Sequence, residues 1–117
     1  AVFTKKQIRS VFNSLNTKTP AIISIFCGRI SDAGNDVTEY INYANKLKRK
    51  KKNVEILWAS TREAYNFLQA KQLRCNIITM PPKVINQINS FGKSFKEMTI
   101  DTVKGFLKDS KKSKFKI

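Results

Sequence analysis

The chain has 117 residues, of which 23 are Lys or Arg and 8 are Asp or Glu, so its formal net charge is +15. This length predicts one domain or part of one, and a hydrophobic content of 41% is enough to build a core. The sequence contains no histidine, which excludes His-based triads and His metal sites, and no run approaches the ~20 apolar residues of a membrane span.

The two cysteines, Cys27 and Cys75, lie in apolar runs and lack the spacing of metal ligands. We therefore expect reduced thiols in a cytoplasmic protein, with Cys27 as inert packing and with no metal and no cofactor. The first residues, 1–3, resemble the end of a strand, which suggests that the chain is a fragment or a processed product.

The expected elements alternate between strands and helices. Helical spacing of apolar residues follows capping residues such as Thr4 and Asp36, and short apolar runs between these stretches predict buried strands. In order, we expect a strand end at 1–3, a helix at 4–15, a strand at 21–27, a helix at 36–48, a strand at 54–59, a helix at 61–71, a strand at 75–80, a short helix at 83–90 and a C-terminal helix at 99–108. Ser60 with Glu63, and Thr99, are the predicted caps of two of these helices.

This alternation predicts an α/β fold made of parallel strand–helix repeats with right-handed crossovers. About three and a half such units are present, whereas a closed (β/α)8 barrel needs eight units and about 250 residues. The sequence therefore predicts a single domain over 1–117 that is either a small open sheet or about half of a TIM-type barrel.

The strand at 21–27 runs directly into a polar loop predicted at 28–34. In an extended chain Ser24 and Phe26 point to one face and their neighbours to the other. Gly28 permits an unusual backbone angle, and Arg29 is a fixed cation with a bidentate fork. Because α/β proteins place binding sites at the carboxyl ends of their strands, we expect Arg29 to meet an anion there.

Three motifs together resemble the C-terminal half of a transaldolase. They are S-x-F-x-G-R-I-x-D at 24–32, I-L-W-A-S-T-R at 56–62 and I-I-T-M-P at 77–81. The wider family includes the fructose-6-phosphate aldolases, and its members are (β/α)8 barrels of class I aldolase type. The resemblance covers the whole chain, and it favours the half-barrel over the small open sheet.

The resemblance also implies roles for five residues. Arg29 resembles the arginine that grips the substrate phosphate, and Ser60 and Arg62 resemble the second half of that phosphate site. Ser24 resembles a serine near the substrate hydroxyls. Phe26 occupies a position where transaldolases tend to have Phe and fructose-6-phosphate aldolases Tyr, so it favours transaldolase.

Two features depart from the family pattern. Ile25 replaces a proline often found between Ser24 and Phe26. The family's Schiff-base lysine and its acidic partners lie on earlier strands, so we expect that lysine upstream of this chain and assign no catalytic residue within it. Lys83 follows a proline in a helix-like segment and is not a candidate.

Each candidate also has a structural interpretation. Ser60 with Glu63 could be a simple helix cap rather than a source of free amides for an anion, and Arg29 and Arg62 could form surface salt bridges. The remaining alternatives are packing for Phe26, a satisfied core hydroxyl for Ser24, pairing with an arginine or loop capping for Asp32, and core filling for Trp58.

Basic runs at 46–52 and 111–116 raise the possibility of nucleic-acid binding. However, no aromatic residue interleaves with 46–52, and a helix C-terminus favours cations. A solvated face is the preferred interpretation, and nucleic acid is the less favoured partner.

The expected function is transaldolase-like transfer of a dihydroxyacetone unit between sugar phosphates through a lysine Schiff base. The alternatives are a carbon–carbon lyase of the fructose-6-phosphate aldolase type, a non-catalytic half-barrel that binds sugar phosphates, and a basic nucleic-acid-binding domain. The expected partners are sugar phosphates of the fructose 6-phosphate and erythrose 4-phosphate class, together with an N-terminal half of the barrel or a further copy, and no membrane.

Overall fold

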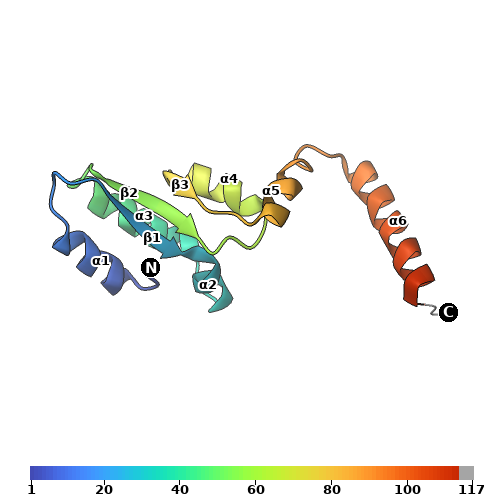
Figure 1. The fold of residues 1–117 in the computed structure, drawn as a ribbon, viewed down its shortest axis with the longest axis horizontal. Helices are drawn as coiled ribbons and strands as arrows, with labels where there is room; N and C mark the ends of the chain where they lie inside the picture. The colour runs from blue at the N-terminus through green and yellow to red at the C-terminus, as the bar shows by residue number, and fades with distance from the viewer. Residues whose placement is uncertain (114–117) are drawn as a thin grey trace.

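A computed structural model describes residues 1–113, with side chains through residue 108. Its centre is a parallel sheet in the order β1 (Ala21–Phe26), β2 (Val54–Ala59), β3 (Ile77–Ile78) (Figure 1). Val2 adds a parallel bridge to Ile25, on the edge of β1 away from β2. The predicted α/β class with parallel strands is therefore confirmed.

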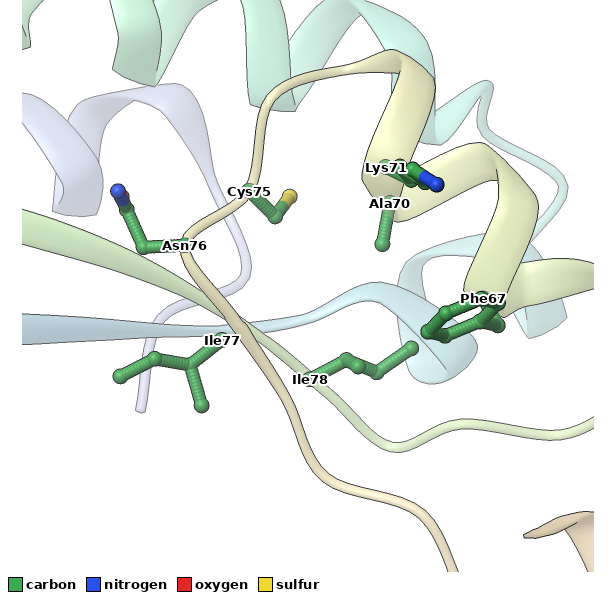
Figure 2. Close-up of a pocket in the computed structure, with 7 residues that line it drawn as sticks. All are labelled: Phe67, Ala70, Lys71, Cys75, Asn76, Ile77 and Ile78. Carbon is green, nitrogen blue, oxygen red and sulfur yellow. The ribbon is translucent and has the colours of Figure 1, made fainter.

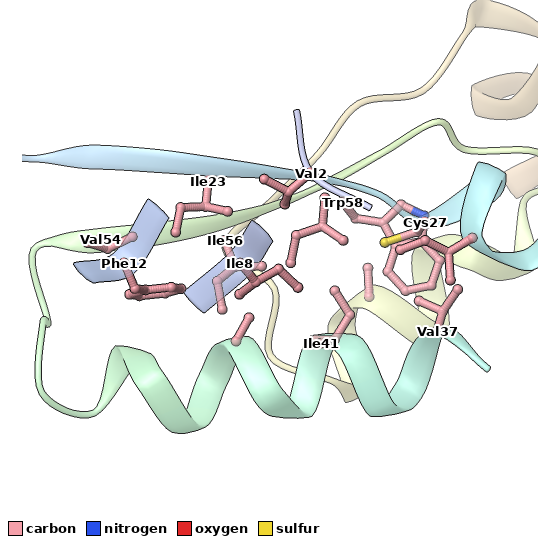
Figure 3. Packing of buried hydrophobic residues seen from close by; sticks show 14 residues of the cluster. Val2, Ile8, Phe12, Ile23, Cys27, Val37, Ile41, Val54, Ile56 and Trp58 are labelled. Atoms are coloured by element: carbon pink, nitrogen blue, oxygen red, sulfur yellow. The ribbon is translucent and has the colours of Figure 1, made fainter. Parts of the chain in front are cut away.

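Helices α1 (Lys5–Ser14) and α3 (Val37–Lys48) pack on one face of this sheet (Figures 1 and 3). The other helices, in chain order, are α2 (Cys27–Asp32), α4 (Tyr65–Gln72), α5 (Pro82–Ile88) and α6 (Phe95–Ser113). Helices α1 and α3 lie side by side, and their apolar stripes meet the sheet residues that alternate toward them. Figure 3 shows this core, which includes Ile8, Phe12, Ile23, Ile25, Ile41, Val54, Ile56 and Trp58.

The other face of the sheet is only partly covered. Along β1, Ile22 is 56% exposed and Ser24 and Phe26 are half-buried, while Ile23 and Ile25 are buried in the core. This alternation agrees with the two faces expected from the sequence.

Two helices begin where the sequence placed their caps. The Thr4 hydroxyl accepts a hydrogen bond from the Gln7 amide at 3.0 Å, and the Gln7 side-chain oxygen accepts one from the Thr4 amide at 3.1 Å. The Asp36 carboxylate accepts from the Thr38 amide at 2.9 Å at the start of α3. These bonds satisfy amides that the helix itself leaves unpaired.

Several expected elements differ from the structure. The segment predicted as a loop at 28–34 contains the helix α2. The strand predicted at 75–80 is confined to Ile77–Ile78. This segment pairs only with β2, and Pro81 cannot extend the strand because proline has no backbone N–H to donate. Thr99 does not cap the last helix, because that helix begins at Phe95. The Thr99 hydroxyl instead donates to the Phe95 carbonyl within the helix, at 2.8 Å.

Helix α6 projects away from the sheet (Figure 1). The radius of gyration is 19.0 Å, whereas a compact chain of this length would have about 13 Å. The apolar residues expected to form its inner stripe are exposed at Ile100, Val103, Phe106 and Leu107. The side chains of the basic run at 111–116 lie outside the described residues. Within residues 1–113 the helices are too short or too polar to cross a membrane.

The basic run at 46–52 is not a uniform solvated face. Lys51 is half-buried, and its ammonium donates to the carbonyls of Phe12 and Leu15 at the end of α1. Lys51 thus supplies donors to carbonyls that the C-terminus of α1 leaves without a partner within the helix. For this one lysine the surface interpretation is wrong.

Candidate functional site

The carboxyl ends of β1 and β2 meet at one edge of the sheet, because Phe26 pairs with Ala59. Just beyond this pair, Gly28 in α2 lies against the turn after β2. A Cβ on Gly28 would lie 1.8 Å from the Ser60 carbonyl oxygen, 2.9 Å from Ser60 Oγ and 3.0 Å from Arg62 Cγ. Only a glycine allows this approach. Gly28 is therefore needed for the close approach of α2 to this turn. The expectation that Gly28 has an unusual backbone angle is wrong, because the glycines with positive φ are Gly34 and Gly92.

Ser60 has φ = +62°, in the left-handed region. For a residue with a side chain this conformation costs about 1–3 kcal/mol, so the surrounding contacts must hold it. A helix N-cap has extended geometry instead, and α4 in fact begins at Tyr65. The predicted helix at 61–71 therefore starts too early, and the Ser60–Glu63 capping box is wrong.

Asn66 has a role that the sequence did not indicate. Its side-chain oxygen accepts hydrogen bonds from the amides of Arg62 and Glu63 at 3.0 and 3.1 Å. These are the amides expected to be free for an anion, and in the structure they are occupied. An Asn just inside a helix start is the only sequence signal of this arrangement, since its short amide side chain readily bonds nearby backbone groups.

Two contacts orient the Arg62 side chain. Its stem lies on Gly28, and its Nη2 is 2.8 Å from Oδ2 of Asp32 at the end of α2. The predicted pairing of Asp32 with an arginine is thus confirmed. The two side chains are 53% and 58% exposed, so this pair adds little stability.

Arg29 takes a different direction. Its guanidinium carbon lies 5.6 Å from the centre of the Phe26 ring, and Phe3 meets that ring edge-on at 5.2 Å. Ser24 lies on the same face of β1 as Phe26. The structure therefore brings Arg29 of α2 to Phe26, on the strand face that also bears Ser24, and brings Ser60 and Arg62 to Gly28. Within the described residues these two groups do not line a common hollow.

A polar hollow of about 260 Å³ lies between α2 and α4. It is lined by Gly28, Ser31, Asp32, Trp58, Arg62, Glu63, Asn66 and Gln69. Of the candidate residues only Arg62 lines it. Trp58 is 2% exposed and fills the core as expected. Its indole N–H has no partner among the described side chains, and the hollow is large enough for water to accept from it.

A second hollow of about 210 Å³ lies beside β3, and Figure 2 shows its lining residues. They are Phe67, Ala70, Lys71, Cys75, Asn76, Ile77 and Ile78. Burial raises the pKa of Cys75 to about 11, so this thiol is protonated near neutral pH. Burial likewise raises the pKa of Cys27, which is fully buried in the core. Neither cysteine is a nucleophile near pH 7.

Comparison with known proteins identifies the chain's relatives. The family described as Transaldolase/Fructose-6-phosphate aldolase matches residues 1–117. A protein of Myxococcus xanthus (strain DK1622) named "Probable transaldolase" is 32% identical over 92 residues, which are 77% of this chain and 39% of that relative. The matched part of the chain thus spans well under half the length of this relative. The chain belongs to the transaldolase/fructose-6-phosphate aldolase family.

Proposed function

We propose that this chain is the C-terminal half of a (β/α)8 barrel and supplies the phosphate-binding part of a transaldolase-like active site. The one-sided layering supports the half-barrel, because a barrel has all its helices on the outer face of the sheet. Ile22, Ser24 and Phe26 would then face the barrel interior. The apolar hollow beside β3 is where elements of the other half, or of a further copy, would pack.

The contact of Gly28 with Ser60 and Arg62 carries the proposal. It joins the turn after β2 to α2, the helix that bears Arg29, at the edge where parallel α/β proteins bind ligands. Two guanidinium groups and a hydroxyl at one edge suit a phosphate, which accepts several charge-assisted hydrogen bonds. The side chains supply this recognition, because Asn66 occupies the nearby amides.

To bind the phosphate, the Arg62 guanidinium must either leave Asp32 or bind both Asp32 and the phosphate. An exposed ion pair contributes about 0–1 kcal/mol, and a phosphate that accepts several charge-assisted hydrogen bonds at this edge would exceed that contribution. The exchange is therefore favourable. Until the substrate binds, Asp32 and Gly28 keep the Arg62 side chain at the edge of the sheet.

Ser24 and Phe26 would form part of the wall along the sugar. Phe26 favours a transaldolase over a fructose-6-phosphate aldolase, and the relative named "Probable transaldolase" supports the same choice. Arg29 rests on the Phe26 ring, so a change at this ring would also move the arginine that meets the phosphate.

In the proposed reaction a strand lysine outside these 117 residues attacks the ketose carbonyl and forms an imine with loss of water. The imine accepts the electron pair when the carbon–carbon bond breaks and an aldose phosphate leaves. The dihydroxyacetone unit retained on the lysine then adds to the aldehyde of an acceptor sugar phosphate, and water releases the product. In the aldolase alternative, water releases dihydroxyacetone itself.

Borohydride trapping tests this function in the full-length protein. Borohydride added with fructose 6-phosphate should reduce the imine and leave a stable adduct on one lysine, detected by mass spectrometry. Absence of an adduct together with thermal stabilisation by fructose 6-phosphate would instead indicate the non-catalytic half-barrel. Absence of both would reject the proposed function.

A further inference from the structure

A third hollow lies at the opposite edge of the sheet, near the amino ends of β2 and β3. It measures about 400 Å³ and is called the basic hollow here, lined by Asn45, Lys48, Arg49, Lys52, Arg74 and Asn76. Strand β2 has six residues, or roughly 17 Å at about 3.3 Å per residue. The basic hollow is therefore separate from the candidate phosphate site.

Two segments far apart in the sequence build the basic hollow. The end of α3 and the residues after it supply three cations, and the turn between α4 and β3 supplies Arg74. Two hydrogen bonds hold these segments together, from Asn45 Nδ2 to the Leu73 carbonyl and from Lys48 Nζ to Asn76 Oδ1, both at 2.7 Å. The two segments and the Lys48 ammonium are thus held in place before any ligand arrives.

The lining of the basic hollow contains four cations and no carboxylate, so no acidic side chain of the lining balances its positive charge. Glu55, the acidic residue next to the basic run, is exposed on β2 between the buried Val54 and Ile56 and so lies on the sheet face away from α3. Four cations around one hollow repel each other. An anion with several charges would relieve this repulsion.

The backbone conformation of Arg74 places its guanidinium at the basic hollow. Its φ is +61°, directly after the last turn of α4, where glycine is the usual residue. Its amide still donates to the Lys71 carbonyl at 3.2 Å and closes the helix end. A strained, non-glycine residue therefore occupies the position that brings a guanidinium to the hollow.

We infer that the basic hollow binds a small anion that carries two or more linked phosphate groups. Its volume lies within the range of small-molecule pockets, about 300–1,000 Å³. Aromatic residues are missing from its lining, so a nucleobase would find no stacking surface. Lysine and arginine are the side chains that bind phosphates, and the two asparagines add neutral hydrogen-bond donors.

Isothermal titration of the full-length protein with inorganic tripolyphosphate, at fixed ionic strength, tests the inference. The variant is Lys52→Ala with Arg74→Gly, where glycine suits the left-handed backbone and preserves folding. The matched control is Lys6→Ala with Lys18→Ala, which removes the same charge from exposed positions outside the hollow. We expect at least tenfold weaker binding in the variant and less than twofold in the control. Equal weakening in both, or no binding to the unmodified protein, would overturn the inference.

Two further ligands identify the class of anion and the site. A short single-stranded oligonucleotide that binds the basic hollow more tightly than tripolyphosphate would overturn the small-ligand assignment in favour of nucleic acid. Fructose 6-phosphate binding should be unchanged in the Lys52→Ala, Arg74→Gly variant, and tripolyphosphate binding should be unchanged in Arg29→Ala. A failure of the basic hollow thus leaves the proposed function untouched, whereas loss of tripolyphosphate binding in Arg29→Ala would contradict the separation of the two sites.

Discussion

Arg62 reaches from the turn after β2 to Asp32 at the end of α2, with 2.8 Å between Nη2 and Oδ2. The same arginine rests its stem on Gly28. A phosphate at this edge would compete with the Asp32 carboxylate for the guanidinium.

Asp32→Asn should therefore tighten the binding of fructose 6-phosphate, because it removes both the competitor and a negative charge. The gain should reach at most about fivefold, the factor that corresponds to the ~1 kcal/mol upper value of an exposed ion pair. Calorimetric titration of the full-length protein measures it. Weaker binding in Asp32→Asn would show instead that the carboxylate is needed to orient Arg62.

Arg29→Ala should weaken fructose 6-phosphate binding by about 10- to 100-fold, because a hydrogen bond to a charged group contributes about 1.5–3 kcal/mol. Arg9→Ala is the matched control, since Arg9 is an exposed arginine on α1. Titration of both variants under identical salt gives the comparison. Equal losses would point to general charge attraction rather than to a site.

Gly28→Ala should destabilise the fold by about 1–3 kcal/mol or more, because the new methyl group would overlap the Ser60 carbonyl. Gly105→Ala provides the control, because Gly105 lies within α6 and a Cβ there meets nothing within 4 Å. That change should stabilise the helix by roughly 0.5–1 kcal/mol. Urea denaturation measures both, and equal stability of Gly28→Ala and the unmodified protein would contradict the close approach of α2 to the turn.

Lys51→Met should lower the free energy of unfolding by about 1–3 kcal/mol, because the carbonyls of Phe12 and Leu15 lose a charged donor. Lys50→Met, one position earlier and exposed, should change it by less than about 0.5 kcal/mol. Thermal unfolding at matched salt distinguishes the two lysines. A similar loss of stability in both variants would support the interpretation of the whole basic run at 46–52 as a solvated face.

Stability should fall as the pH rises from 9 to 11. Burial raises the pKa of Cys75 from 9.0 to about 11, so in this range the thiol ionises in the unfolded chain before it does in the folded one. Below pH 9 both states hold the proton and the contribution to stability is complete. Urea unfolding at pH 8 to 11 measures the decline, and Cys75→Ala should reduce it. An unchanged decline in Cys75→Ala would exclude this thiol as a cause.

The faces of β1 and β2 were predictable because burial alternates along each strand, as at Ile23, Ser24 and Ile25. Local hydrogen bonds likewise made the starts of α1 and α3 predictable at Thr4 and Asp36. In both cases the determining interactions lie within a few residues of one another.

The short helix α2 and the turn at Ser60 could not be predicted in this way. Helix α2 has six residues, too few for a periodic pattern, and its position depends on the contact of Gly28 with a turn 32 residues later. The left-handed Ser60 resembled an ordinary helix cap in sequence. The pairing of Asp32 with an arginine was predictable, but the choice of Arg62 required the geometry of α2.

The most direct test is an NMR titration of the full-length protein with fructose 6-phosphate, observed at the arginine Nε–Hε signals. We predict that the signals of Arg29 and Arg62 shift together with one dissociation constant, while that of Arg9 stays in place. Arg29→Lys and Arg62→Lys would assign the two signals. Shifts confined to other arginines, or none at saturating ligand, would contradict a sugar-phosphate site at this edge of the sheet.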